Sequence, residues 1–376
     1  MIRNSVFNFG KVRPFCGKYA AKHSDFFNFI EQLRVSLPDD WFFRPLRAEI
    51  EITNRCNQKC PSCGMYNLND LEPISRIEML KLMNDLKDNR IPSMAITGGE
   101  PFIEKETLLE LIQLGSKIGV DVSKITTNAF WGHSLKSIKD NLDCLLEAGL
   151  LGNRYFVPLI MMSLGEQTVS VGNLSNVIHY VAQNFKETEV HIGVSSLRTN
   201  NIHKTDALRD DYFNRYGVDF PENLVHITYS DYVSNDDNNQ SENTKKRMRS
   251  LEAIENCYMC FDECVGSYVL PTILIKKDGT VYACSCFNVP KKYFTLGNVY
   301  REPLRLILER ANKNDNIRII KELGIRGLLA KLPKEEQEKL RDVYVDSYCE
   351  VCRILMDRIG ELATEPHKNK MSKTIK

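Results

Sequence analysis

Hydrophobic and polar residues follow two alternating patterns between residues 46 and 231. Short segments that are apolar at every second position, or at every position, favour β-strands. The segments between them have apolar residues three or four positions apart, as amphipathic helices do. Six strands are expected, within residues 47–53, in the segment that ends at residue 97, and within residues 124–128, 155–163, 190–196 and 224–229. Helices are expected from residue 75, at residues 104–117 and 134–148, and from about residue 175 to residue 185.

Residues at the ends of these segments support the helices. Ser75 and Glu78 have the spacing of a capping box, in which each side chain binds the backbone of the other residue. Gly119 and Gly149 follow two of the helices and are expected to end them. Strands that alternate with helices are joined by crossovers and therefore run parallel. The pattern predicts an α/β fold with a parallel sheet, whose functional residues lie where the strands end.

The composition changes after residue 231. Residues 232–250 are rich in Asn, Asp and Ser, and few of them could be buried, so we expect a linker there. Further on, residues 272–284 alternate on both sides of Asp278-Gly279, a dipeptide typical of a tight β-hairpin. Five parts are expected: an aromatic-rich extension packed on the core (1–45), a core domain (46–231), the linker (232–250), a cysteine-rich C-terminal domain with the hairpin (251–360) and a basic, disordered tail (361–376).

Composition and charge argue against several classes of function. The 376 residues are 43% apolar, enough for a large core, and 50 basic against 49 acidic residues leave a formal charge of +1. This balance gives no reason to expect a nucleic acid or a membrane surface as partner. No apolar run approaches the ~18 residues that span a bilayer, and the N-terminus lacks the apolar core of a secretory signal. A cytoplasmic protein is expected.

Twelve cysteines in a chain that is not expected to be secreted indicate metal binding rather than disulfides. Cys56, Cys60 and Cys63 follow the first strand with the spacing Cys-x3-Cys-x2-Cys. Three converging thiolates can hold a soft metal centre, but they lack the fourth ligand of a closed zinc site. An iron–sulfur cluster on three cysteines keeps one iron open to a small molecule. A zinc knuckle completed by a distant residue, or a redox-active group of thiols, is the alternative.

A second motif, Gly98-Gly99-Glu100-Pro101, follows the second strand. Glycines let a backbone approach a ligand closely, and a carboxylate accepts hydrogen bonds from an ammonium group. A Gly-Gly pair alone is more often a plain turn. Its position after the cysteine motif, at the end of the next strand, favours a ligand-binding loop.

In this order and at strand ends, the two motifs resemble the signature of the radical S-adenosylmethionine (SAM) superfamily. The resemblance covers roughly half of the chain and implies an open, parallel (β/α)6 partial TIM barrel. It implies that the three cysteines bind a [4Fe-4S] cluster and that Gly98, Gly99 and Glu100 meet the methionine end of SAM. Ser62 departs from the family, which often has an aromatic residue at that position in contact with the adenine.

Polar residues at the ends of strands three to five match further SAM contacts of the family, although polar residues can also simply finish a strand. These residues are Thr127, Asn128, Ser163, Ser195 and Arg198. The sequence identifies no catalytic acid, base or hydrogen donor.

A second group of cysteines lies around the expected hairpin. The spacing Cys264-x14-Gly279-x4-Cys284, with a later Cys349-x2-Cys352, resembles the auxiliary-cluster domains called SPASM and, in shorter form, Twitch. The resemblance implies that these four cysteines hold one auxiliary [4Fe-4S] cluster, because three further cysteines are too few to ligate a second one fully. The three, which are alternative ligands or part of a second cluster, are Cys257, Cys260 and Cys286. A structural zinc ribbon is the other interpretation of this region.

The resemblance implies that the chain reductively cleaves SAM to methionine and a 5′-deoxyadenosyl radical, which takes a hydrogen atom from a substrate. A reducing protein such as flavodoxin or ferredoxin would be a partner. Modification of a peptide or protein side chain is the favoured reaction, although no module for leader recognition is evident. Dehydrogenation or rearrangement of a small sugar or cyclitol alcohol is the alternative. Outside this family, an iron–sulfur electron-transfer or sensor protein that does not use SAM, and a zinc-stabilised interaction module, stay open.

Overall fold

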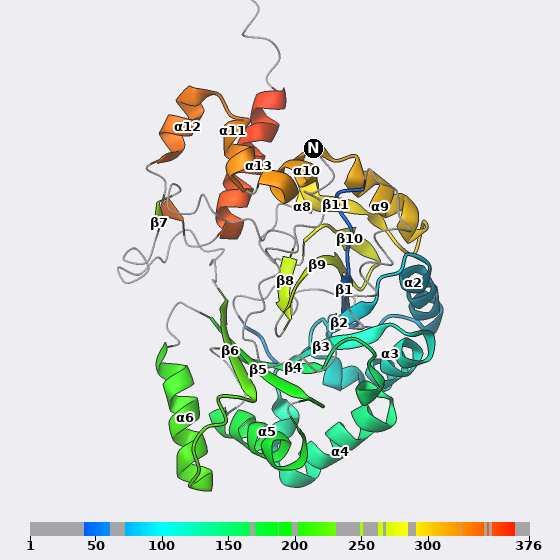
Figure 1. Cartoon of the computed structure of the whole chain (residues 1–376), viewed down its shortest axis with the longest axis vertical. Coiled ribbons are helices and arrows are strands. Elements are labelled where there is room, and N and C mark those ends of the chain that lie inside the picture. Colours follow the sequence, from blue (N-terminus) through cyan, green and yellow to red (C-terminus); the bar gives the residue numbers. More distant parts are fainter. Residues whose placement is uncertain are drawn as a thin grey trace, which may run out of the picture.

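The structure is a computed structural model, and Figure 1 draws the whole chain. It describes residues 41–60, 72–165, 170–186, 188–197, 202–230, 249–250, 262–265, 268–284, 291–323, 325–341, 344–345 and 348–364. Residues 1–40 of the N-terminal extension lie outside the described residues, as do all but the last two residues of the expected linker. The expected disordered tail, 361–376, begins too early, because residues 361–364 form the end of a helix; its other residues lie outside the described ones.

Six parallel strands form the centre of the molecule, as the alternating pattern predicts. They are β1 (Arg47–Glu51), β2 (Ser93–Thr97), β3 (Asp121–Thr127), β4 (Leu159–Leu164), β5 (His191–Leu197) and β6 (Val225–Ser230). Each strand pairs in parallel with the next one along the chain. Within the described residues β6 does not return to pair with β1, so the sheet stays open. The predicted open parallel α/β fold is confirmed.

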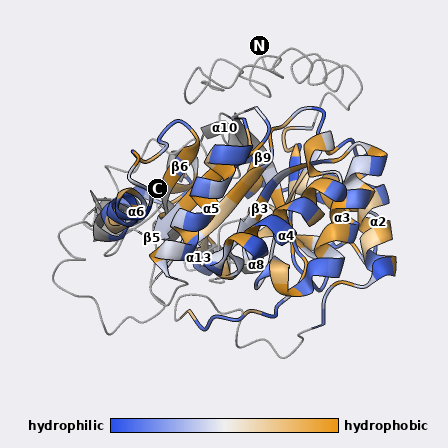
Figure 2. Cartoon of the chain, turned by 90° about the horizontal axis from the view of Figure 1, so that it is seen from below, coloured by the Kyte–Doolittle hydropathy of each residue, from blue (hydrophilic) through white to orange (hydrophobic). Residues whose placement is uncertain are grey.

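Helices fill the connections between these strands. They are α2 (Arg76–Asp88), α3 (Lys105–Ile118), α4 (Leu135–Glu147), α5 (Val171–Asn184) and α6 (Ile202–Tyr216), with short 3-10 turns η4 (Pro101–Glu104), η5 (Phe130–His133) and η6 (Leu150–Gly152). In Figure 1 helices α2 to α6 form an arc around the outside of the strands. Figure 2 shows that these helices are hydrophobic and hydrophilic on different sides, as a helix between a core and solvent should be.

The helix signals act as the sequence predicts. The Ser75 hydroxyl accepts a hydrogen bond from the Glu78 backbone N–H at 3.3 Å, and the Ser75 N–H donates to the Glu78 carboxylate at 2.9 Å, which completes the capping box at α2. Gly119 ends α3 with a φ of 80°, a left-handed conformation that glycine adopts without steric cost.

Two elements begin four residues away from their predicted starts. Strand β4 begins at Leu159 instead of Tyr155, because the carboxylate of Asp121 accepts hydrogen bonds from the backbone N–H groups of residues 154, 155 and 156, at 2.9, 2.5 and 3.1 Å. Those donors therefore do not enter the sheet. Helix α5 begins at Val171, four residues before the expected start at Ser175.

The expected hairpin is present, and it continues the core sheet. Strands β9 (Tyr268–Ile275) and β10 (Thr280–Tyr282) are antiparallel, with the turn closed at Gly279, whose φ is 83°. Strand β9 also pairs in parallel with β1, so the sheet runs in the order β11-β10-β9-β1-β2-β3-β4-β5-β6. Strand β11 spans Thr295–Asn298, and β8 (Asp262–Val265) pairs with β9 off this path. The domain boundary near residue 231 stays a prediction.

The remaining elements lie beyond the hairpin. They are α8 (Lys291–Phe294), α9 (Leu304–Asn312), α10 (Asp315–Leu323), α11 (Ile325–Ala330), α12 (Lys334–Arg341), α13 (Tyr348–Thr364) and a short pair of β7 (Arg249–Ser250) with β12 (Tyr344–Val345). The Asn312 side chain on α9 exchanges two hydrogen bonds with the Phe43 backbone, at 2.8 and 2.9 Å. Phe42 and Phe43 are buried, so the described end of the N-terminal extension packs on the core.

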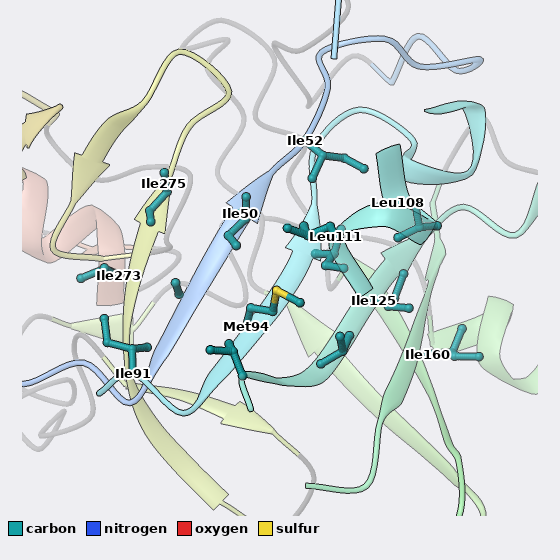
Figure 3. Close-up of a cluster of buried hydrophobic side chains, with 14 of the residues drawn as sticks. Ile50, Ile52, Ile91, Met94, Leu108, Leu111, Ile125, Ile160, Ile273 and Ile275 are labelled. Atoms are coloured by element: carbon teal, nitrogen blue, oxygen red, sulfur yellow. The ribbon is translucent and has the colours of Figure 1, made fainter. Parts of the chain in front are cut away.

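The hydrophobic core lies between the sheet and its outer helices. Figure 3 shows Ile50, Met94 and Ile125 of successive strands facing Leu108 and Leu111 of α3. Isoleucines of β9 extend the same cluster past β1. No helix in the described part of the chain is both long and apolar enough to cross a bilayer.

Candidate functional site

The cysteine motif leaves the end of β1 as an extended loop. Cys56 and Cys60 are half-buried and form no disulfide. Both contact Gln58, whose backbone N–H lies 3.4 Å from the Cys56 sulfur and whose side-chain Oε1 lies 3.6 Å from the Cys60 sulfur. The structure thus gathers two of the three predicted ligands around one residue. Cys63 lies outside the described residues.

The two glycines bring the next strand end against this loop. A Cβ atom on Gly98 would lie 2.5 Å from the Thr53 carbonyl oxygen, and one on Gly99 would lie 2.0 Å from the Arg55 carbonyl oxygen. The backbones are joined by hydrogen bonds from Gly99 N to Thr53 O at 2.7 Å and from Glu100 N to Arg55 O at 2.8 Å. Both glycines are therefore required by close contact with the cysteine loop itself. Their predicted contact with SAM stays a prediction.

Glu100 is fully buried between the ends of β2 and β3. Its carboxylate accepts hydrogen bonds from the Phe102 N–H (3.1 Å), the Thr127 hydroxyl (2.8 Å) and the Asn128 N–H (2.6 Å). Burial raises the pKa of Glu100 to about 7, although these hydrogen bonds act in the opposite direction. A carboxylate has about four acceptor positions, and protein donors occupy three of them. The contact of Glu100 with the ammonium group of SAM stays a prediction.

Asn128 connects this carboxylate to the cysteine loop. Its side-chain oxygen accepts a hydrogen bond from the Phe130 N–H at 3.0 Å, and its side-chain nitrogen donates to the Asn57 side-chain oxygen at 2.7 Å. An ion pair of 2.9 Å between Arg55 and Glu104 holds the same loop from another side. Sequence reasoning did not single out Asn57, because its only signal is its place next to Cys56.

The other predicted SAM contacts fall into three groups. Thr127 is buried, and its hydroxyl oxygen accepts bonds from Ala129 N (3.0 Å) and Trp131 Nε1 (3.2 Å) in addition to its bond to Glu100. Ser163 and Ser195 are direct neighbours on β4 and β5, both half-buried, so the sheet brings them together. Arg198 lies outside the described residues.

The side of the sheet away from the helices is polar, which sequence reasoning did not foresee. Glu49 and Glu51 alternate with the core residues Ala48 and Ile50 along β1, yet both glutamates are buried. Lys124 on β3 lies 3.3 Å from Glu49, and Lys276 after β9 lies 2.5 Å from Glu51. The alternation is visible in the sequence, but the burial of both faces and the ion pairs that accompany it are not.

Four cysteines were predicted to hold an auxiliary cluster. Cys284 follows β10 and is half-buried, and Cys352 on α13 is buried. The backbone of Cys264 is paired with Val269 in the β8–β9 ladder, and Cys349 lies one helical turn before Cys352, which places both on the same face of α13. The three alternative ligands of this region, Cys257, Cys260 and Cys286, lie outside the described residues. The ligand set stays a prediction.

The described residues fit an iron–sulfur cluster. Two cysteine sulfurs contact the same residue, Gln58, in a loop whose start is held by backbone hydrogen bonds, and cysteine thiolates are the usual ligands of such clusters. No group of three potential metal ligands occurs among the residues that the structure describes, because the third cysteine of the motif is not one of them.

Comparison with known families decides what these motifs belong to. Residues 50–150 match the family described as "4Fe-4S single cluster domain", and this range holds both the cysteine motif and the Gly-Gly-Glu motif. This match supports the resemblance of the two motifs to the signature of the radical SAM superfamily. The comparisons support SAM and a [4Fe-4S] cluster as cofactors, while the bounds of the core domain stay a prediction.

Individual relatives span different parts of this radical SAM enzyme. The "Putative peptide biosynthesis protein YydG" of Bacillus subtilis is 21% identical over 82% of this chain and 92% of that protein. The PqqA peptide cyclase of Bradyrhizobium diazoefficiens is 24% identical over 43% of this chain and 41% of its own length. Among solved structures, native anSMEcpe with bound AdoMet and Kp18Cys peptide aligns with a TM-score of 0.49 at 13% identity, over 84% of this chain and 98% of that one.

Proposed function

We propose that this radical SAM enzyme modifies a side chain of a peptide or protein. The observation that carries the proposal is the similarity to YydG, which is named a peptide biosynthesis protein and which the chain matches over 92% of its length. The PqqA peptide cyclase, whose name states a peptide substrate, supports the same class of substrate over a shorter range.

The residues proposed to hold the cofactors lie at adjoining strand ends. Cys56, Cys60 and Cys63 would bind the [4Fe-4S] cluster, while Glu100 would hold the methionine end of SAM. When bound, the two groups together supply a radical that abstracts hydrogen from the substrate. The chain's own part is to orient them. Hydrogen bonds of 2.6 to 2.8 Å hold the Glu100 carboxylate between β2 and β3, and its full burial keeps water from it.

Ser163 and Ser195 are proposed to contact SAM further along the sheet, since they lie side by side on β4 and β5. Arg198, three residues beyond Ser195, is proposed as another contact on sequence grounds alone.

We also propose one auxiliary [4Fe-4S] cluster on Cys264, Cys284, Cys349 and Cys352. The pair lies three residues apart on α13, and Cys284 lies two residues after the hairpin strand β10. After anaerobic reconstitution, about eight irons per chain are expected if both clusters form, and about four if only the SAM cluster does. A reducing protein such as flavodoxin or ferredoxin is the proposed electron donor.

The test is turnover with short peptides encoded beside the gene. Reconstituted enzyme, SAM and a strong reductant should yield 5′-deoxyadenosine together with a mass change in one peptide, located to a side chain by fragmentation. The variant with Cys56, Cys60 and Cys63 all changed to Ala should yield neither product. The proposal is wrong if deoxyadenosine forms but responds to sugar or cyclitol alcohols and to none of the peptides. Absence of deoxyadenosine would overturn SAM cleavage as well.

A further inference from the structure

Gln58, between the first two cysteines of the motif, contacts both of their sulfurs. Its backbone N–H donates to Cys56 Sγ at 3.4 Å, and the Cys60 thiol donates to its Oε1 at 3.6 Å. Neither family motif includes this position, and the site described above leaves it without a role. Gln58 thus connects the two predicted cluster ligands that the structure describes.

The position of Gln58 is set by the contacts of the residues before it. The preceding residues are held by the Asn57–Asn128 hydrogen bond of 2.7 Å and by the Arg55–Glu104 ion pair of 2.9 Å. Asn128 is oriented in turn, because its oxygen accepts the Phe130 N–H at 3.0 Å and so directs its nitrogen towards Asn57. Gln58 is therefore presented to the sulfurs by a fixed loop.

Binding of iron changes what these sulfurs require. An iron-bound cysteine sulfur is a thiolate, which accepts hydrogen bonds and donates none. The backbone N–H of Gln58 already points at Cys56. The oxygen and nitrogen of a side-chain amide exchange places by a half-turn of the amide group, at almost no change in shape. After that turn the Gln58 Nε2 donates to the Cys60 thiolate from the same place where Oε1 now accepts from the thiol.

We propose that Gln58 donates hydrogen bonds to two of the three thiolates of the SAM cluster and thereby raises the reduction potential of that cluster. Reduction adds one negative charge, and hydrogen bonds to the sulfurs stabilise the more negative state. Gln58 is thus a positioning residue that acts through the ligands. The inference rests on the proposed function only in placing a cluster on these cysteines; it does not depend on what the substrate is.

The test compares Gln58→Met with Gln113→Met. Methionine keeps the length of the side chain and removes its N–H donors, while Gln113 is exposed on α3 and offers the same replacement away from the loop. Both reconstituted proteins are titrated with reductant, and the EPR signal that changes when SAM is added identifies the cluster concerned. Loss of one hydrogen bond should lower the equilibrium constant for reduction about tenfold, which is ~59 mV for one electron. Equal potentials in the two variants and the wild type would overturn the proposal.

A second measurement covers the case in which Gln58→Met binds no iron. Wild-type protein carrying glutamine labelled with ¹⁵N in the side-chain amide should show a ¹⁵N coupling to the reduced cluster in pulsed EPR, and Gln113→Met should retain that coupling. A labelled wild-type cluster without such a coupling contradicts the proposal. The two proposals also fail separately. If no peptide is modified, the proposed substrate is wrong, but the reduction potentials still test the role of Gln58. If peptides are modified normally and the potentials of the two variants and the wild type are equal, only the role of Gln58 is wrong.

Discussion

The Glu100 carboxylate joins two strand ends, and its partners could not be found from the sequence. The motif containing Glu100 was visible because Gly98 and Gly99 are its neighbours in the chain. Thr127 and Asn128, which donate to the carboxylate at 2.8 and 2.6 Å, are more than 25 residues away. Only the parallel pairing of β2 with β3 brings these residues together. The sequence therefore singles out these residues as separate SAM contacts but does not reveal the hydrogen bonds among them.

Burial of Glu100 predicts a pH-dependent stability. Its pKa rises from 4.5 to about 7 on folding. Between pH 4.5 and pH 7 the Glu100 carboxyl group is protonated more in the folded chain than in the unfolded chain. The contribution of Glu100 to the free energy of unfolding therefore falls as the pH rises. In Glu100→Gln that dependence is absent. The measurement is urea titration of the cluster-free wild type and variant at several pH values. The difference in free energy of unfolding, wild type minus variant, should fall from pH 4.5 to pH 7 and then level off. A difference that does not vary with pH would contradict this.

Substitution of Gly99 should prevent assembly of the cluster. A Cβ there would lie 2.0 Å from the Arg55 carbonyl oxygen, so Gly99→Ala must push the cysteine loop away from the end of β2. We expect the iron content after reconstitution to fall severalfold. Gly119→Ala is the control, because it strains a left-handed residue by about 1 kcal/mol but meets no atom within 4 Å. Comparable iron contents in the two variants would show that the contact is dispensable.

At the scale of single elements, local signals predicted most of what was observed. The capping box at Ser75 and the left-handed Gly119 depend on residues within one turn, and both act as expected. Strand β4 was predicted too early, since Tyr155 begins an apolar run that looks like a strand. What holds that run out of the sheet is Asp121, an acceptor more than 30 residues before it. Patterns of hydrophobicity contain no information about such a distant acceptor.

Removal of the Asp121 carboxylate should therefore destabilise the start of β4. Asp121→Ala leaves three backbone N–H groups without this acceptor, two of them in the buried residues Tyr155 and Phe156. Each unsatisfied buried donor costs about 1–3 kcal/mol, so a loss of about 3 kcal/mol in the free energy of unfolding is expected. Asp143→Ala, which removes an exposed partner of Lys139, should leave stability nearly unchanged. Similar unfolding midpoints for the two variants would rule out this role of Asp121.

At the scale of the whole molecule, the sheet crosses the boundary that composition predicts. The hairpin was predicted from Asp278-Gly279, but its pairing with β1 was not, because β1 and β9 lie more than 200 residues apart. Period-two patterns identify strands without naming their neighbours. The Lys276–Glu51 ion pair strengthens the same junction, where it links the hairpin to the strand that leads into the cysteine loop. The two predicted domains therefore share one hydrogen-bonded sheet.

A shared sheet predicts that damage to the hairpin spreads into the core. In Gly279→Ala a new Cβ would lie 2.4 Å from the Tyr300 ring, and the φ of 83° would be strained by at least ~1 kcal/mol. Because β9 is hydrogen-bonded to β1, hydrogen–deuterium exchange should speed up in residues 47–51 as well as in residues 268–282. Gly217→Ala, a left-handed glycine after α6 with open space around it, should leave both segments protected. Faster exchange confined to residues 268–298 would instead mean that the C-terminal part unfolds as a separate domain.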